Sequence, residues 1–262
     1  MAFDVVGDIA IVEPGTDGGT FLQEHKNVNV VLAKKSEIEG DFRVRDYEII
    51  ASRSEARDFS DVPGIMRPKK LTETVHKENG CRFKVDITEA YFSVRLSTER
   101  ARIANMVKKG ERVLVMFAGV GPYPIVIARM AEPDLVVGVE LNPYAVRFFE
   151  DNIMLNKMEG KVRAIEGDVK DAVPKLKEEF DRVIMPLPKE SDTFLYLATK
   201  RIKKSGVIHL YKILHENDLD AFLQELKKNL SRVRIEVIKA GEYAPGSFRY
   251  CFDIYTDAVA KK

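Results

Sequence analysis

The spacing of apolar residues differs between the two halves of the chain. Before residue 93, short apolar runs alternate with turn residues, a pattern typical of small β-rich units. Gly7-Asp8 and Asn79-Gly80 each separate two such runs and predict antiparallel hairpins. A further apolar run covers Val28 to Leu32, and Pro63-Gly64 indicates a loop. We therefore predict a small α+β domain over residues 1–92.

From about residue 96, apolar strands alternate with helices. Leu96 to Met106 predicts the first helix, with Ser97 or Thr98 as its cap. The strands that we expect next are 112–117, 135–140, 162–165, 182–185, 207–211, 233–240 and 249–255. The helices between them are 124–130, 143–155, 172–177, 193–202 and 218–228. This order predicts a mainly parallel, doubly wound α/β sheet over residues 93–262, ending in an antiparallel hairpin that turns near Gly241.

Composition and charge exclude several classes of protein. Apolar residues make up 45% of the chain and charged residues 32%, so the chain is neither disordered nor collagen-like. The formal net charge is +1, and any nucleic-acid surface must therefore be local. The best such candidate is the segment 66–110, which holds 11 Lys or Arg against 5 Asp or Glu. Cys81 and Cys251 form neither a metal-spaced pair nor a disulfide framework, which suits a reducing cytoplasm.

The sequence indicates no signal peptide and no membrane span. The N-terminus lacks a basic region followed by an apolar one. The most membrane-like stretch, Val113 to Ala131, is interrupted by glycines, prolines and an arginine. We interpret it as a strand, a turn and a helix.

That strand, turn and helix form the first candidate ligand site. Gly119 and Gly121 remove side chains where a backbone must approach a ligand. A nicotinamide dinucleotide site has a similar layout. However, Pro122 and Pro124 follow the turn, and each removes an N–H group that would cradle a pyrophosphate.

The following strands also end in polar or conformationally special residues. Glu140 ends the next strand, where a carboxylate accepts hydrogen bonds from ribose hydroxyls. Asp168 follows the third strand, where it can bind an adenine amino group or merely cap a helix. Pro186 follows the fourth. Open α/β sheets bind ligands at this edge, and the ordered set favours S-adenosylmethionine over a dinucleotide or a fold without a ligand.

Five sequence blocks carry a family resemblance. They are Lys34–Arg45, His76–Gly80, Tyr91–Arg100, Met116–Pro122 and Tyr243–Pro245. Together they resemble the archaeal and eukaryotic tRNA (guanine-N1)-methyltransferases that act on the guanosine 3′ to the anticodon. The related aminocarboxypropyl transferases of the wybutosine pathway share the architecture but are less similar in the Arg95-Leu96-x-x-Glu99-Arg100 block.

The resemblance implies a Rossmann-like class I methyltransferase domain after a small RNA-positioning domain. It further implies S-adenosylmethionine as cofactor, no metal, and the anticodon arm of tRNA as partner. We expect a cytoplasmic monomer with neither a membrane nor a DNA partner. Many members carry another N-terminal domain that binds the tRNA elbow, whereas this sequence begins at the equivalent of the second domain.

The resemblance also assigns roles to residues. Arg43 matches the arginine that holds the target base, and Glu99 matches the general base. The cofactor-binding candidates are Tyr91, Arg100, Phe117, Gly119, Gly121, Glu140, Leu141, Asp168, Val169 and Pro186. The RNA-binding candidates are Arg43, Arg45, Arg67, Lys69, Lys70 and Arg95. Two positions depart from the family pattern: Val115 replaces an acidic residue, and Pro186 replaces an asparagine that contacts the target guanine.

Three functional hypotheses follow. The first is methyl transfer to guanine N1, which needs the base turned out of the RNA and its N1 proton removed. From spacing alone, Glu99 is better explained as complementing a helix N-terminus, whose dipole favours an acidic residue, and the resemblance reverses this preference. The second hypothesis is aminocarboxypropyl transfer to a wyosine precursor. The third, suggested by Val115 and Pro186, is a non-catalytic RNA-binding protein with a degenerate cofactor pocket.

Overall fold

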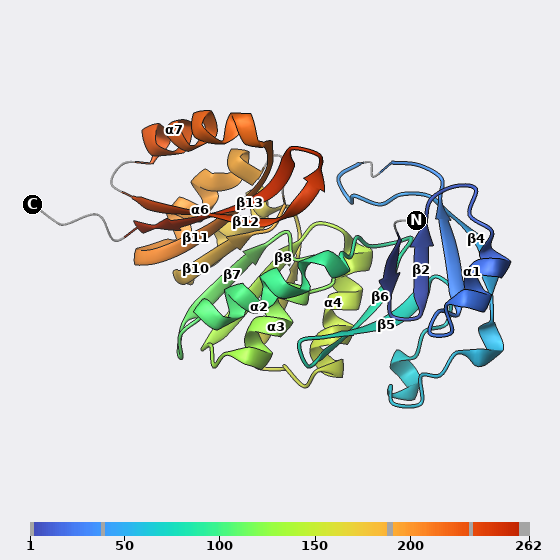
Figure 1. Ribbon diagram of the computed structural model, residues 1–262. Helices are drawn as coiled ribbons and strands as arrows, with labels where there is room; N and C mark the ends of the chain where they lie inside the picture. The colour runs from blue at the N-terminus through green and yellow to red at the C-terminus, as the bar shows by residue number, and fades with distance from the viewer. Residues whose placement is uncertain (1–2, 38–39, 188–190, 231–232, 257–262) are drawn as a thin grey trace, which may run out of the picture.

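The computed structural model describes residues 3–37, 40–187, 191–230 and 233–256. Figure 1 shows a small N-terminal sheet lying beside a larger sheet that is covered by helices. The small sheet has the order β1-β2-β3-β4. Its elements are β1 (Asp4–Val6), β2 (Ile9–Val12), α1 (Gly18–Glu24), β3 (Val30–Lys34) and β4 (Tyr47–Ser52). The predicted hairpin at Gly7-Asp8 is confirmed, whereas helix α1 was not expected.

The large sheet has seven strands in the order β12-β13-β11-β10-β7-β8-β9. They are β7 (Arg112–Met116), β8 (Leu135–Glu140), β9 (Val162–Glu166), β10 (Phe180–Met185), β11 (Ile202–His215), β12 (Arg234–Ala244) and β13 (Ser247–Tyr255). The strands from β11 to β9 pair in parallel, while β13 is antiparallel to both of its neighbours. The predicted mainly parallel sheet with a C-terminal antiparallel hairpin is therefore confirmed.

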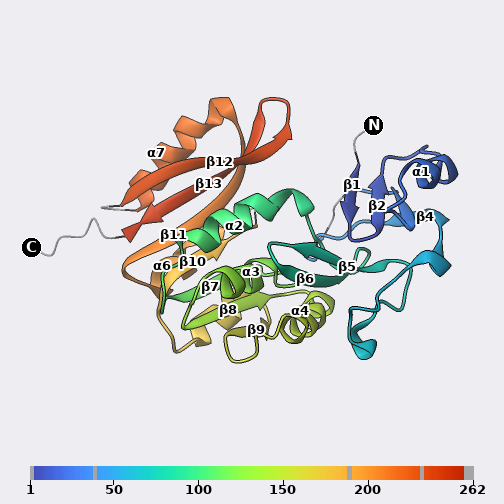
Figure 2. The same ribbon diagram turned by 60° about the horizontal axis from the view of Figure 1, so that its bottom comes forward.

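Helices lie on both faces of this sheet, as Figure 2 shows. They are α2 (Ser97–Met106), α3 (Pro122–Met130), α4 (Pro143–Leu155), α5 (Val169–Ala172), α6 (Leu195–Arg201) and α7 (Leu219–Asn229). The expected helix over 172–177 is wrong. Helix α5 ends at Ala172 and a short 3₁₀ turn, Val173–Lys175, follows. Pro174 lies in this turn and has no N–H group to continue an α-helix.

Two details of the predicted termini are also wrong. The residue before helix α2 is Leu96, and no side chain caps the helix. Ser97 instead accepts hydrogen bonds from the Asn79 side chain through its hydroxyl and carbonyl oxygens. The C-terminal hairpin turns after Ala244, where Gly246 has a φ of +71°. Gly241 lies within β12 at a break in the strand register, as expected of a bulge.

A second hairpin connects the two halves of the molecule. Strands β5 (Glu73–Glu78) and β6 (Cys81–Asp86) pair across Asn79-Gly80, as the sequence predicts. Asn152 on α4 and Asn156, the residue that ends this helix as its C-cap, each donate to and accept from the backbone of β6, at Lys84 and Arg82 respectively. Their amides thus replace a neighbouring strand along this edge of β6.

The hydrophobic core is continuous through this hairpin. Val6 and Ile9 of the small sheet belong to the same buried cluster as Phe83 of β6 and Val115 of β7. The proposed domain boundary after residue 92 stays a prediction. Val115 is fully buried, which explains why an apolar residue is accommodated there. No helix in the described ranges is both long and apolar enough to cross a bilayer.

Candidate active site

The glycine turn between β7 and α3 lies at the carboxyl edge of the large sheet. Phe117, Gly119 and Gly121 all have positive φ angles, from +57° to +85°. A Cβ atom on Gly121 would lie 2.0 Å from the ring of Phe149, so only glycine fits there. A Cβ on Gly119 would meet nothing closer than the Tyr91 carbonyl oxygen at 3.8 Å. The turn therefore packs against Phe149 at Gly121, whereas its backbone at Gly119 is open to a ligand.

Glu140 connects this turn to the end of β8. Its carboxylate accepts hydrogen bonds from the backbone N–H groups of Gly119 at 2.7 Å and Asn142 at 2.9 Å. Burial raises the pKa of Glu140, and these bonds only partly oppose that effect. Each carboxylate oxygen retains a lone pair, so Glu140 can accept further hydrogen bonds from ribose hydroxyls.

The next strand ends are arranged as the sequence predicts. The Asp168 carboxylate accepts a hydrogen bond from the Lys170 N–H at 2.8 Å and so caps α5. Leu141, the residue after Glu140, is 38% exposed, and Val169, the residue after Asp168, is buried. Pro186 follows β10 and is half-buried, while Pro188 lies outside the described residues. The cofactor roles of these residues stay predictions.

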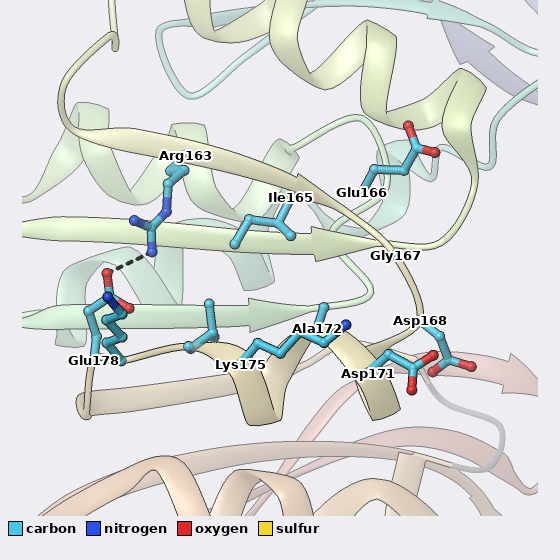
Figure 3. Close-up of a pocket in the computed structure, with 11 residues that line it drawn as sticks. Arg163, Ile165, Glu166, Gly167, Asp168, Asp171, Ala172, Lys175 and Glu178 are labelled. Carbon is cyan, nitrogen blue, oxygen red and sulfur yellow. Dashed lines mark hydrogen bonds and ion pairs between the residues drawn. The ribbon is translucent and has the colours of Figure 1, made fainter.

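A separate groove of about 540 Å³ runs along the outer edge of the sheet. Figure 3 shows Asp168 and Asp171 at one end and the Arg163–Glu178 ion pair at the other, with Glu166 turned away. Among the described cofactor candidates, only Asp168 lines this groove. This groove is therefore distinct from the face formed by the glycine turn and Glu140.

Glu99 lies in the first turn of α2 and is 6% exposed. Arg102 donates to both of its carboxylate oxygens, each at 2.8 Å. The hydroxyl of Tyr211, on β11, donates to Oε1 at 2.5 Å. Tyr211 packs near Tyr123, which belongs to the first turn of α3 beside the glycine turn. Glu99 is therefore adjacent to the candidate cofactor site, but both of its oxygens have partners inside the protein.

The pairing of Glu99 extends into a buried charge network. Arg102 also donates to Asp253 on β13 at 2.7 Å, and His209 lies 2.6 Å from the same carboxylate. Burial alone would raise the pKa of Asp253, but hydrogen bonds from His209 and Arg102 hold it well below its usual value. Burial lowers the pKa of His209, which keeps the ring neutral near pH 7.

Three side chains of this network also have the spacing of metal ligands. His209, Cys251 and Asp253 present ligand atoms within 4.8 Å of one another. Arg102 binds Asp253, and a nitrogen of Arg182 lies 2.6 Å from His209 Nε2. Two guanidinium groups next to these ligand atoms disfavour a bound cation. The arrangement is better explained as an ion-pair network.

Arg100 holds the loop before α2 in place. Its guanidinium forms a two-bonded ion pair with Glu78, at 2.6 and 2.5 Å, and donates to the Ser93 carbonyl at 3.0 Å. Its Cζ lies 5.4 Å from the ring of Phe92. Arg100 therefore joins the β5–β6 hairpin to the Tyr91–Ser93 segment, and its direct contact with a cofactor stays a prediction.

Arg43 reaches the same edge from the N-terminal half. It has a φ of +55°, and its Cζ lies 4.9 Å from the ring centroid of Tyr91. Burial lowers the pKa of Arg43, and Arg249 adds to this effect, whereas Tyr91, Tyr243 and Glu140 oppose it. The fold therefore places Arg43 over the cofactor candidate Tyr91, and the charge of a second candidate, Glu140, acts on its pKa.

Of the other five predicted RNA-binding cations, four have intramolecular partners among the described residues, and Lys69 contacts Glu73 through its backbone N–H. Arg95 pairs with Asp4 at 2.8 Å, and Lys70 pairs with Asp86 and Glu89. The remaining contacts are Arg67 with the Val62 carbonyl, the Lys69 backbone with Glu73, and Arg45 with Glu37. Exposed ion pairs contribute only about 0–1 kcal/mol, so a phosphate can compete for such cations. Their role in RNA binding stays a prediction.

The sequence-based predictions include neither Arg102 nor Tyr211, which bind Glu99, and they do not include Arg249. Arg102 is three residues after Glu99, a spacing that places two side chains on one helix face. Acidic and basic residues at this spacing are common on helices, so the spacing alone does not indicate a functional site. Tyr211 and Arg249 are distant in sequence, and no local pattern identifies them.

Together, the strand order, the glycine turn and the carboxylate at the end of β8 define a class I methyltransferase fold. Residues 74–238 match the family model of the TRM5/TYW2 methyltransferase domain. The chain belongs to this family.

Two relatives agree with this assignment. The tRNA (guanine(37)-N(1))-methyltransferase Trm5b of Pyrococcus abyssi is 37% identical over 96% of this chain and 74% of its own length. Its crystal structure superposes with a TM-score of 0.78 at 35% identity, covering 97% of this chain and 74% of that one. The Methanocaldococcus jannaschii TYW2 structure, in complex with AdoMet, gives 0.67 at 26% identity, covering 97% and 98%.

Proposed function

We propose that this protein transfers a methyl group from S-adenosylmethionine to N1 of guanosine 37 in tRNA. The observation that carries the proposal is the position of Arg43, whose guanidinium lies over the ring of the cofactor candidate Tyr91. A residue suited to holding a base and residues suited to holding the methyl donor therefore share one site. The activity named for the Pyrococcus abyssi relative supports the same substrate.

The residues present fit the cofactor. The backbone at Gly119 is open, and the Glu140 carboxylate has lone pairs left for ribose hydroxyls. Asp168 is available at the next strand end for the adenine amino group. When bound, S-adenosylmethionine supplies an electrophilic methyl group on its sulfonium. The protein contributes mainly by holding the acceptor nitrogen in line with that methyl group.

Arg43 would bind the target base. A guanine in a folded anticodon arm must leave its stack before its N1 atom can react. An arginine donates to the guanine O6 acceptor, and a guanidinium near the carbonyl also stabilises the negative charge that develops when N1 loses its proton. Arg43 has no ion pair within the described residues, so its donors are available for this contact.

Glu99 would accept the N1 proton. A positioned general base contributes about 10²–10⁴-fold to such a reaction. In the present structure Glu99 is buried, Arg102 donates to both of its carboxylate oxygens, and Tyr211 also donates to Oε1. Only Oε2 keeps a free lone pair, and it faces Arg102. We therefore propose that Glu99 gives up at least one hydrogen bond to Arg102 for the base when tRNA binds. Catalytic hydrogen bonds commonly form only in the substrate complex, and this makes such an exchange compatible with the resting geometry.

The test is to incubate the protein with labelled S-adenosylmethionine and an unmodified tRNA transcript, then to identify the modified nucleoside by mass. The proposal predicts N1-methylguanosine from a transcript with guanosine at position 37. A matched transcript with adenosine at that position should give no product. Label at another position, or none despite cofactor binding, would contradict the proposal.

One observation favours a second candidate. Pro186 has neither a side-chain amide nor an N–H group with which to contact a guanine. We therefore retain aminocarboxypropyl transfer to a wyosine precursor as the alternative, which the same mass measurement distinguishes. The non-catalytic hypothesis predicts that S-adenosylmethionine does not bind. A calorimetric titration of the protein with S-adenosylmethionine tests this prediction.

A further inference from the structure

A second arginine, Arg249, lies on the C-terminal hairpin, and its charge acts on the base-binding candidate Arg43. Arg249 is in β13, opposite Ile213 of β11 and Gly241 of β12. Side chains two residues apart point to the same face of a strand. Arg249 therefore shares a face with Cys251 and Asp253, which border the Glu99 network, and lies nearer to the carboxyl edge.

Arg249 lacks the partners that the neighbouring charges have. It is half-buried, and its Nε atom is buried without a hydrogen-bond partner. Within the described residues it forms no ion pair, in contrast to Arg102 on the same side of the sheet. Leaving a buried donor unpaired is costly unless a ligand satisfies it. Gly241, directly opposite, leaves open space, because a Cβ there would meet nothing within 4 Å.

The surroundings of Arg249 are suited to an anion. Strand β12 of this hairpin packs against Val94–Leu96, shortly after Tyr91, and the Arg43 guanidinium lies over the Tyr91 ring. The positive charge of Arg249 also helps to lower the pKa of Arg43. Tyr243, from the end of the same hairpin, is 60% exposed beside them. In Figure 1 this end of the β12–β13 hairpin extends from the large sheet toward the N-terminal half. Two cations without carboxylate partners, next to an exposed ring, match a nucleotide better than a protein surface.

We propose that Arg249 binds the backbone phosphate of the tRNA nucleotide whose base Arg43 holds. The planar guanidinium presents paired N–H donors that match two phosphate oxygens. The phosphate compensates the repulsion between the two arginines and satisfies the buried Nε donor. This inference rests on the proposed function in that the ligand is an extruded nucleotide of tRNA. It adds a phosphate-binding residue to the site.

The experiment measures tRNA affinity against salt concentration, without cofactor, for the wild type and three variants. Arg249→Gln should weaken binding about tenfold, because a hydrogen bond to a charged group contributes about that factor. It should also reduce the slope of log K against log salt by about 1, since one phosphate contact is lost. Arg249→Lys keeps the charge and should restore the slope but only part of the affinity.

Arg234→Gln is the matched control. It removes the same charge from β12, where Arg234 is exposed and pairs with Glu236. This variant should leave both affinity and slope unchanged. Unchanged affinity in Arg249→Gln, or weaker binding with an unchanged slope, would overturn the phosphate assignment. The binding measurement does not depend on methyl transfer. Failure to form N1-methylguanosine would therefore contradict the proposed function but would not decide whether Arg249 binds a phosphate.

Discussion

The surroundings of Glu99 and Arg43 differ in one respect that explains how the site is prepared. Glu99 has all its strong partners already, from Arg102 and Tyr211, and is buried. Arg43 is half-buried over Tyr91 and, within the described residues, has no carboxylate paired to it. The acidic residue is thus held inside the protein, whereas the basic residue is left for a ligand.

This difference separates stability from binding. Removing one partner of a buried ion pair leaves the other charge uncompensated, which is costly. Removing an unpaired cation has little such cost in the free protein. The Glu99 network should therefore affect folding, and Arg43 should affect the substrate complex. Three variants test this separation.

The largest effect is expected for Arg102→Ala. This change leaves Glu99 and Asp253 without their shared cation, which should lower the free energy of unfolding by about 3–5 kcal/mol. Urea denaturation at neutral pH measures this directly. Arg147→Ala, an exposed position on α4, is the control and should stay within about 0.5 kcal/mol of the wild type. A loss below about 1 kcal/mol for Arg102→Ala would mean that the network contributes little.

The next effect concerns Arg43→Ala. Its unfolding free energy should remain close to that of the wild type, because no described ion pair is lost. Single-turnover methyl transfer at subsaturating tRNA should fall about 10- to 100-fold, as expected for a lost charged hydrogen bond. Cofactor affinity should not change. A normal rate would remove Arg43 from the base-binding role, and a large loss of stability would contradict the comparison itself.

A smaller, pH-dependent effect is expected for Asp253→Asn. The folded pKa of Asp253 lies below its unfolded value of about 3.9, so its contribution is complete above that pH and is lost as the pH falls below it. The stability difference between wild type and variant should therefore be constant near neutrality and shrink in acid. Urea midpoints between pH 7 and about 3 measure it. A difference independent of pH would contradict the assigned charge state.

The amino-acid pattern predicts the framework of the site well. The glycine turn, Glu140 and Asp168 are local features at strand ends, and parallel strands bring such ends to one edge. The partners of Glu99 are different. Tyr211 is 112 residues away in sequence, and Arg102 joins Asp253 across 151 residues. Such pairs depend on how α2 packs against β11 and β13, which no local periodicity specifies.

The same limit applies to Arg249. Its residue type is ordinary for a half-buried strand, and its relation to Arg43 depends on how the C-terminal hairpin packs against the segment after Tyr91. The incorrect helix at 172–177 and the misplaced turn near Gly241 have a local origin instead. In each case a proline or glycine determined the backbone more strongly than the apolar spacing around it.

The central claim is that Glu99 leaves an internal ion pair to accept the N1 proton of the target guanine. Single-turnover methyl transfer by Glu99→Gln, with cofactor and tRNA both saturating, tests it most directly. The account predicts a rate about 10²–10⁴-fold below that of the wild type, with the affinities for S-adenosylmethionine and tRNA retained. A wild-type rate in this variant would show that Glu99 serves only the folded structure, and that another group takes the proton.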